Sequence, residues 1–328
     1  MKTQGLYAGV DIHKDVYVGK LMDDKGDIVF EKSFKPTLDG AKSFLCNFPI
    51  KIIGFEACGM ARAAKRLFTE LGHEVKVGNP NKIKNIVGCI KTDKIDAGVM
   101  AHLLRVNYFP EVYIPNDEVQ KLRDLTRHKS TLTRLQTRVK NQIKSHLLRE
   151  GIQYPKKLWS VLGTQWLSEL EDPIIHNFIN VLQSIGNETN NTLKNIKKIS
   201  KSRRLTNLLM TMPGIAEYSA LMIFAEIADI TRFKTPQKLI MYAGLCPGTH
   251  QSDKTEYNVK NFANNKNLKW ILYECSGRAS LLKGTIFQKH FAKINQKKGY
   301  RIARRSTARK MLIIIWHMLS RQEPFNAQ

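Results

Sequence analysis

The alternation of strand-like and helix-like segments over the first 105 residues is the feature that most constrains how this chain folds. Residues 6–12, 15–22 and 28–34 are short and rich in β-branched and aromatic side chains, and the sequence DDKGD between the last two favours a hairpin turn. Further along, helical periodicity alternates with apolar runs. The pattern predicts helices over 41–48, 60–72 and 92–105, and strands over 51–57 and 73–78.

Three consecutive strands followed by alternating helices and strands are typical of a ribonuclease-H-like (RuvC-like) α/β domain. In such a domain an antiparallel hairpin forms one edge of the sheet, and crossover helices connect the remaining strands. We therefore expect this fold for residues 1–108. Pro110 and Pro115 follow, and because proline interrupts a helix, residues 106–118 are expected to form a linker.

A long amphipathic helix is predicted from Val119 to Arg149, because apolar residues recur there at intervals of three and four. Its other faces carry nine lysine or arginine residues and one acid, Asp124. Two interpretations carry equal weight: a coiled-coil arm that also contacts phosphates, or a helix packed on a core with a solvated basic face. Residues 109–200 as a whole are expected to form a helical arm.

A second apolar unit begins at residues 208–227 and includes the sequence MPGI, which resembles the turn of a helix-hairpin-helix motif. Residues 201–328 are therefore expected to form an α-helical C-terminal domain. Within it, residues 283–310 contain ten basic residues and no acid, with Phe287, Phe291 and Tyr300 interspersed. This segment is the strongest nucleic-acid-binding signal in the chain, and a solvated basic helix is its alternative.

Charge and cysteine content narrow the function classes. Lysine and arginine number 53 against 28 acids, and the net charge of +25 favours a polyanionic partner, of which nucleic acid is the commonest. The sequence has neither an apolar run of about 18 residues nor a signal peptide, so we expect a soluble, cytoplasmic protein without a membrane partner. Five scattered cysteines without a C-x-x-C pair indicate neither a disulfide framework nor a zinc site.

Four carboxylates are predicted to converge at one end of the first domain. Asp11 follows the apolar YAGV of the first strand, Glu56 follows IIGF of the fourth, and these strands are neighbours in a ribonuclease-H-like sheet. Asp93 and Asp96 share one face of the helix that closes the domain. Four such groups repel one another strongly unless a cation intervenes, so the cluster predicts Mg²⁺ or Mn²⁺. Taken singly, each acid also fits a helix cap, a strand end or a turn.

The first domain resembles, in order and spacing of its motifs, the DEDD-type transposases of bacterial insertion sequences, a group that includes the Piv-like invertases. The motifs are GVDIHK, GFEACG, NPNKIKN and KTDKIDA. The basic middle helix and the segment from MPGI to HQSD resemble the same family, so the resemblance covers nearly the whole chain. It implies that Asp11, Glu56, Asp93 and Asp96 bind Mg²⁺ and that Ser252, in HQSD, is the nucleophile.

The resemblance also implies nucleic-acid partners. Members of this family are RNA-guided recombinases in which a non-coding RNA pairs with donor and target DNA, so we expect DNA and a guide RNA as partners. The residues expected to contact them are Lys129, Arg134, Arg138, Lys254, Lys266, Lys269, Lys297, Arg301, Arg304 and Arg305. The chain departs from the family pattern at Asp253 and Asn264, which stand where glycine is usual, and at Lys269, which stands where arginine is usual.

Together these observations predict a DNA recombinase of a mobile element, which cuts and rejoins strands through attack by Ser252 with metal at the four acids. The two catalytic parts fall in separate predicted domains, so we expect a homodimer or homotetramer in which different protomers supply them. Two alternatives stay open. One is a metal-dependent nuclease, resembling a junction resolvase, in which water attacks the phosphate; the other is a non-catalytic nucleic-acid-binding protein.

Overall fold

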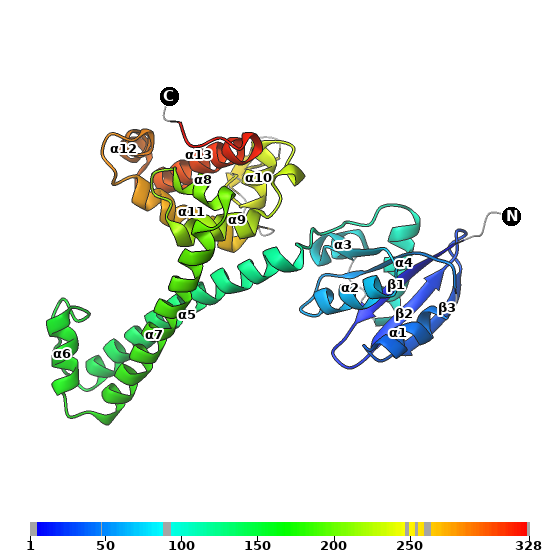
Figure 1. Cartoon of the computed structure of the whole chain (residues 1–328), viewed down its shortest axis with the longest axis horizontal. Coiled ribbons are helices and arrows are strands. Elements are labelled where there is room, and N and C mark those ends of the chain that lie inside the picture. Colours follow the sequence, from blue (N-terminus) through cyan, green and yellow to red (C-terminus); the bar gives the residue numbers. More distant parts are fainter. Residues whose placement is uncertain are drawn as a thin grey trace. The chain divides into compact units, whose positions relative to one another are not determined.

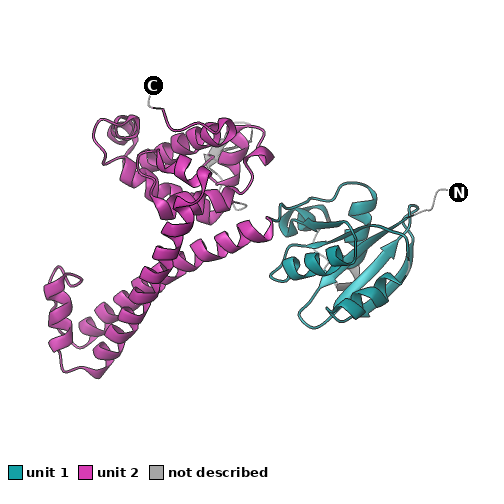
Figure 2. Cartoon of the chain, viewed as in Figure 1, with its two compact units in different colours: residues 1–114 teal, residues 115–328 magenta. Residues whose placement is uncertain are grey.

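A computed structural model of the chain describes residues 5–46, 48–87, 93–246, 249–252, 255–258 and 264–326. Within these ranges, only the backbone is described for residues 87, 93–95, 249–252 and 255–258. The chain divides into two compact units, Met1–Ile114 and Pro115–Gln328 (Figure 2). The finer division of the second unit at about residue 200 stays a prediction.

Unit 1 is built on a five-stranded mixed sheet in the order β3-β2-β1-β4-β5 (Figure 1). The strands are β1 (Leu6–Ile12), β2 (Tyr17–Met22), β3 (Ile28–Phe34), β4 (Ile50–Glu56) and β5 (Val75–Gly78). β1, β2 and β3 pair antiparallel, whereas β4 runs parallel to β1 and β5 runs parallel to β4. All five strands lie where the sequence pattern predicted them, and the α/β class is confirmed.

Four helices complete unit 1: α1 (Leu38–Leu45), α2 (Ala61–Glu70), α3 (Pro80–Val87) and α4 (Asp93–Arg105). Three of them match predicted helices, but α3 was not predicted. This helix is short, with proline as its first residue, and the Asn79 side chain caps it by accepting a hydrogen bond from the Lys82 backbone N–H at 3.1 Å. Such a short segment has too little apolar periodicity to be recognised in sequence.

The two faces of the sheet carry different side chains, because successive residues of a strand point to opposite sides. On one face Val10 of β1 is fully buried in an apolar cluster with Phe44 of α1 and Phe68 of α2. On the other face α4 packs against β1 so closely that a Cβ on Gly9 would lie 1.9 Å from the Ala97 carbonyl oxygen. Glycine at residue 9 is what allows the helix to approach this strand.

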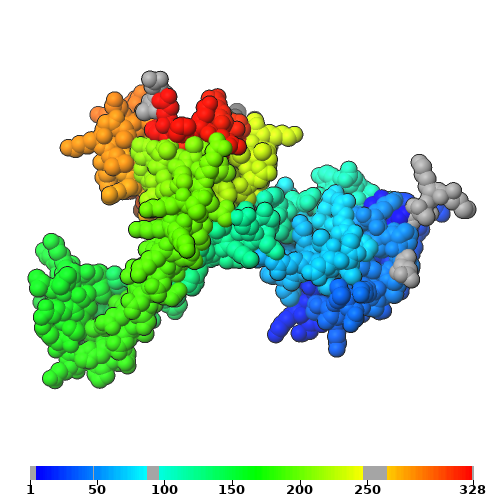
Figure 3. Space-filling model, viewed as in Figure 1, coloured from blue at the N-terminus to red at the C-terminus, as the bar shows by residue number. Residues whose placement is uncertain are grey.

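Unit 2 begins with three helices, α5 (Asp117–Arg149), α6 (Val161–Glu169) and α7 (Pro173–Lys201). α5 and α7 pack along each other through apolar clusters, and in the space-filling view this pair stands out from the rest of unit 2 (Figure 3). α5 confirms the long amphipathic helix, and Asn116 caps it by accepting from the Val119 backbone N–H at 2.9 Å. A coiled-coil geometry for the pair stays a prediction.

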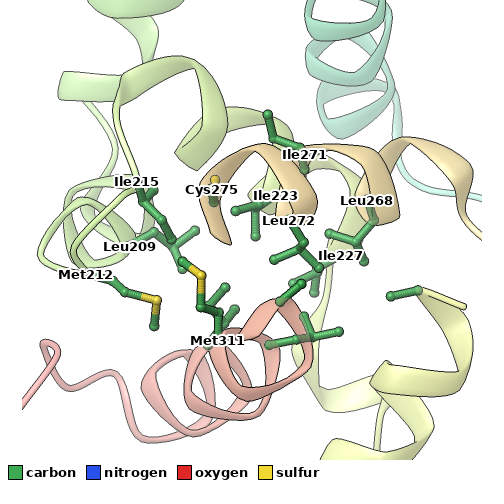
Figure 4. Packing of buried hydrophobic residues seen from close by; sticks show 14 of the residues in the cluster. Leu209, Met212, Ile215, Ile223, Ile227, Leu268, Ile271, Leu272, Cys275 and Met311 are labelled. Atoms are coloured by element: carbon green, nitrogen blue, oxygen red, sulfur yellow. The ribbon is translucent and has the colours of Figure 1, made fainter. Parts of the chain in front are cut away.

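The rest of unit 2 packs around one large apolar core, which includes Leu209, Ile223, Leu272 and Met311 (Figure 4). Its elements are α8 (Arg204–Met210), α9 (Glu217–Ile227), the 3₁₀ turn η1 (Ile230–Arg232), α10 (Pro236–Tyr242), α11 (Lys266–Ala279), α12 (Ile286–Lys298) and α13 (Tyr300–Arg321). The MPGI sequence forms the turn between α8 and α9, as expected. Gly214 in this turn has a φ of +90°, which favours glycine.

The C-terminal part is not purely helical, and on this point the prediction was wrong. Residues between α10 and α11 form an antiparallel hairpin, β6 (Thr249–Ser252) and β7 (Thr255–Asn258), in which Ser252 pairs with Thr255. The two strands are four residues long and polar, so they lack the alternation of apolar and polar residues by which a strand is recognised.

In the ranges that the structure describes, no helix is long and apolar enough to cross a membrane. Cys46, Cys58, Cys246 and Cys275 are free thiols, in agreement with the expectation that these cysteines do not form a disulfide framework.

Candidate catalytic and nucleic-acid-binding sites

Asp11 and Glu56 hold matching positions on two adjacent parallel strands. Gly9 of β1 pairs with Gly54 of β4, and each acid lies two residues further along its strand. Side chains two residues apart share a face, so both acids lie on the face of the sheet that α4 covers. A Cβ on Gly54 would lie 2.7 Å from Leu104 of α4, which confirms that the helix also lies over β4.

The direction of α4 decides which of its residues come near the two acids. Arg105, its last residue, donates a hydrogen bond to the Asp24 carbonyl at 3.2 Å in the turn between β2 and β3. That turn lies beside the start of β1, because Tyr7 pairs with Met22. α4 therefore runs antiparallel to β1, and its first turn lies toward the end of β1 that carries Asp11.

The lengths of helix and strand support the same placement. From the Ala97 contact with Gly9, the backbone of Asp93 lies four residues back along α4, about 6 Å at the helical rise. Asp11 lies two residues on from Gly9 along β1, about 7 Å at the strand rise. The backbones of Asp93 and Asp96 thus come to the same end of the sheet as Asp11 and Glu56.

His13 holds the Asp11 carboxylate: its Nε2 lies 3.0 Å from Asp11 Oδ2. The sequence-based prediction did not include His13, although its spacing of two residues from Asp11 places both on one side of an extended chain. Among the side chains described in the structure, no three of the His, Cys, Asp or Glu type gather closely enough to hold one metal ion. The Asp93 side chain lies outside that description.

A lysine shares the face that carries the acids. Lys20 of β2 pairs with Gly9 in the sheet register and therefore also faces α4, where a Cβ on Gly98 would lie 3.7 Å from its Cδ. Its ammonium lies 3.1 Å from a carboxylate oxygen of Glu31, and only 15% of the lysine side chain is exposed. This ion pair joins β2 to β3 on the face that α4 covers.

The predicted nucleophile, Ser252, ends β6 in unit 2. Its side chain and all of Asp253 and Lys254 lie outside the described residues. The segment that carries the hairpin has its two ends fixed together: Gly244, with a φ of +66°, packs against Asn264, and the Asn265 backbone N–H donates to the Tyr242 carbonyl at 2.8 Å. Asn264 stands where the family usually has glycine, and its side chain fits here because Gly244 has no side chain of its own.

A fully buried carboxylate, Glu226 of α9, lies beneath this junction. Its two oxygens accept hydrogen bonds from Arg127 of α5 at 2.7 and 2.8 Å, and Asn265 donates to it at 2.8 Å. These bonds join the arm helix to the residue that caps α11, and the bond to Glu226 raises the pKa of Arg127. The cluster was not predicted, because its members lie far apart in sequence.

Lys129 and Arg304, both predicted nucleic-acid contacts, make close contacts within unit 2. Lys129 places its ammonium 4.3 Å from the centre of the Tyr218 ring, and burial lowers the pKa of that lysine. Arg304 donates to the Tyr273 carbonyl at 3.0 Å and to Glu274 at 2.9 Å. These contacts fix side chains within the fold, so both residues have a structural role that the sequence did not indicate.

The other predicted contacts that the structure describes lie at the surface of unit 2. Those with exposed side chains are Arg134, Arg138, Lys266, Lys297, Arg301 and Arg305. Lys269 of α11 is half-buried, and its pKa is lowered first by burial and then by the charge of Arg305. Two cations near each other are well suited to bind a phosphate.

Comparison with known families matches both parts of the chain. Residues 8–151 match the transposase domain of the DEDD IS110 type, and residues 206–292 match the transposase domain of the IS116/IS110/IS902 family. The chain belongs to the IS110/IS116 transposase family. Such proteins are the transposases of insertion sequences, which recombine mobile elements.

Individual relatives agree with this family. The transposase of insertion sequence element IS1111A from Coxiella burnetii is 24% identical over 97% of this chain and 90% of its own length. A Sinorhizobium fredii protein, named as transposase y4qE, is 26% identical over 72% of this chain and 60% of its own length. The pilin gene-inverting protein of Moraxella bovis is 28% identical over 37% of this IS110-type chain and 38% of its own length.

Proposed function

We propose that this IS110-type transposase excises and inserts its element by cutting and rejoining DNA, with a ribonuclease-H-like unit 1 that supplies the acidic tetrad. The observation that carries the proposal is the register of Asp11 and Glu56 on β1 and β4, on the face that α4 covers. The first turn of α4, with Asp93 and Asp96, comes to the same end of the sheet.

The donor set at this end of the sheet fits a hard divalent cation. Asp11, Glu56, Asp93 and Asp96 supply only carboxylate oxygens, which Mg²⁺ and Mn²⁺ prefer, and Asp11 and Glu56 each lie two residues beyond the paired Gly9 and Gly54. When bound, such a cation polarises a phosphoryl oxygen and stabilises the charge that develops on the phosphate. His13 keeps the Asp11 carboxylate oriented through its 3.0 Å hydrogen bond.

In the proposed reaction the Ser252 hydroxyl oxygen attacks a backbone phosphorus atom. A phosphoserine ester forms, one P–O bond of the DNA strand breaks, and the serine proton is transferred overall to the departing strand oxygen, which leaves as a hydroxyl. Because one ester replaces another, the bond energy is conserved and a second hydroxyl can reverse the step to rejoin strands. No high-energy cofactor is required for this exchange.

The proposed partners are donor DNA, target DNA and a guide non-coding RNA. The exposed cations of unit 2 support this proposal, because they bind phosphate without reading base sequence, which leaves sequence recognition to pairing by the RNA. We also propose a homodimer or homotetramer, since the acids and Ser252 belong to different compact units. A monomer in sedimentation with nucleic acid bound would contradict this.

Trapping of a covalent adduct tests the chemistry. The full chain is incubated with Mg²⁺, labelled element-end DNA and its flanking non-coding RNA, then denatured, and the label that migrates with protein is measured. We expect an adduct with the wild type and with the exposed-serine control Ser184→Ala, and no adduct with Ser252→Ala. Free cleaved ends from Ser252→Ala would instead support the water-dependent nuclease.

A second pair of variants tests the acids. Asp11→Asn should abolish cleavage and the adduct while the chain still binds DNA. Asp39→Asn, which changes an exposed acid in the first turn of α1, should retain both. Full activity of Asp11→Asn would favour a chain whose acids have no part in the reaction, and with it the non-catalytic alternative.

A further inference from the structure

A cleft of about 470 Å³ lies between the arm helix α5 and the first turn of α11. α5 contributes Thr133, Arg134 and Thr137 to its walls, and α11 contributes Lys266, Asn267 and Trp270. The volume lies in the range of clefts that bind small molecules or single groups of a larger ligand. The two walls come from segments about 130 residues apart, so sequence alone gives no sign of this cleft.

Among the described side chains, no carboxylate neutralises the positive charge of the cleft. Arg134 and Lys266 are exposed, and neither has a carboxylate within ion-pair distance among the described side chains. Arg134 makes only long hydrogen bonds of 3.4 Å, to the carbonyl of Ser130 and the hydroxyl of Thr131. Both cations can therefore bind an anionic oxygen, and a phosphate is the anion that fits the chemistry of this family.

The threonine hydroxyls of the cleft act as hydrogen-bond acceptors, whereas Arg134 and Lys266 are donors. Thr133 donates its hydroxyl hydrogen to the Lys129 carbonyl at 3.1 Å, and Thr137 donates to the Thr133 carbonyl at 3.0 Å. Each hydroxyl oxygen has then used its only hydrogen and can act only as an acceptor. These oxygens suit the amino or imino groups of a base, or a ribose 2′-hydroxyl.

An aromatic ring completes the set. Trp270 is half-buried, and it contacts Tyr218 edge-on, with centroids 6.5 Å apart and planes at 64°. The Lys129 ammonium over the Tyr218 ring holds that tyrosine in turn. Trp270 also lines the cleft, so part of its indole surface faces the open volume and offers the kind of apolar surface on which bases stack.

We propose that this cleft binds one unstacked nucleotide of a single-stranded nucleic acid. The phosphate contacts Arg134 and Lys266, the base stacks on Trp270, and donors of the base or sugar bind Thr133 and Thr137. A base inside a duplex is stacked on both sides and cannot occupy such a site without leaving the helix. The inference rests on the proposed function only for the class of partner, and it does not depend on Ser252 chemistry.

The test measures binding of labelled oligonucleotides to the full chain by fluorescence anisotropy, with single-stranded RNA, single-stranded DNA and duplex DNA of equal length. Trp270→Ala should weaken binding of single strands about tenfold, because base stacking is lost, and should change duplex binding less than twofold. Tyr108→Ala changes an exposed aromatic residue of unit 1, outside the basic segment and the cleft, and is the matched control; it should leave single-strand binding within twofold.

Trp270 also packs against the apolar core, so Trp270→Ala could weaken binding by destabilising the fold. A second variant separates the two effects. Thr133→Val keeps the shape of the side chain but removes the acceptor, and should weaken single-strand binding several-fold with an unchanged melting temperature. If Thr133→Val weakens binding of single-stranded RNA more than binding of single-stranded DNA, the threonine oxygen accepts from a ribose 2′-hydroxyl and the bound strand is RNA. If the two losses are equal, the threonine oxygen accepts from the base.

Single-strand binding that both Trp270→Ala and Thr133→Val leave within twofold of the wild type would overturn the proposal. The covalent adduct is measured separately. If these variants bind normally while Ser252→Ala still abolishes the adduct, the cleft inference alone is wrong. If the variants lose single-strand binding while Ser252→Ala retains the adduct, the proposed nucleophile alone is wrong.

Discussion

The buried Glu226 offers the sharpest test of how unit 2 is held together. Its carboxylate is fully buried and accepts three hydrogen bonds, two from the Arg127 guanidinium and one from the Asn265 amide. The backbone carbonyl of the same residue accepts a further bond from Arg123 at 2.9 Å. Glu226→Gln keeps the size of the side chain but removes its charge, so Arg127 would lose its ionic partner. Buried Arg123, whose Nε lies 3.7 Å from Glu226 Oε2, would lose that charge as well but keep its bonds to the carbonyls of Ala225 and Glu226.

The expected cost follows from burial. Removing one partner of a buried ion pair costs about 3–5 kcal/mol, because the remaining charge is left without compensation. Arg127 is 39% exposed, so water compensates part of this loss, and we expect about 2–3 kcal/mol. For a unit of this length that corresponds to a fall in melting temperature of about 5–10 °C.

Urea unfolding followed by tryptophan fluorescence is a selective assay, because the four tryptophans of the chain all lie in unit 2. The matched control is Glu188→Gln on α7, whose carboxylate is 55% exposed and lies 3.9 Å from His128. The control should change the free energy of unfolding by less than about 0.5 kcal/mol. A similarly small change for Glu226→Gln would refute the reasoning, since the buried network would then add no net stability.

Three further predictions concern other parts of the chain. Gly9→Ala should destabilise unit 1 by about 2 kcal/mol or more, because the added Cβ would collide with a backbone carbonyl of α4. Thermal unfolding followed by circular dichroism measures this. The control Gly59→Ala, which has open space around it, should change the free energy of unfolding by less than about 0.5 kcal/mol. The pKa of Asp172 is lowered by its hydrogen bond to the buried His146, so the ionised carboxylate stabilises the fold above pH 3.8, and this stabilisation is lost as the pH falls below that value. In Asp172→Asn the urea midpoint should therefore decline less between about pH 5 and 3 than in the wild type. An equal decline in both proteins would contradict this. Arg305→Ala should reduce the slope of log binding constant against log salt concentration for DNA by about one, without a change in the stability of the protein. Arg304→Ala, which breaks a hydrogen bond to Glu274 of α11, should lower the stability and leave that slope unchanged.

Much of unit 1 could be predicted from sequence because its signals are local. β-branched segments and a DDKGD turn determine the hairpin, and helical periodicity determines α2 and α4. The position of Asp11 and Glu56 at the ends of apolar runs predicted that they end neighbouring strands, and in the structure each lies two residues beyond the paired Gly9 and Gly54. Their role in binding metal stays a prediction. The short helix α3 and the polar hairpin β6–β7 were missed because such short elements carry too few apolar residues to form a pattern.

The sequence by itself determined the excess of positive charge, the long basic helix α5 and the acids that follow two buried strands. Only the tertiary structure decided which charges are available to a ligand. Lys129 and Arg304 look like their neighbours in sequence, yet one lies over Tyr218 and the other binds Glu274, whereas Arg134 and Lys266 meet across a cleft without an acid. The physical reason is that the partner of a side chain is set by packing between distant segments, which local periodicity does not encode.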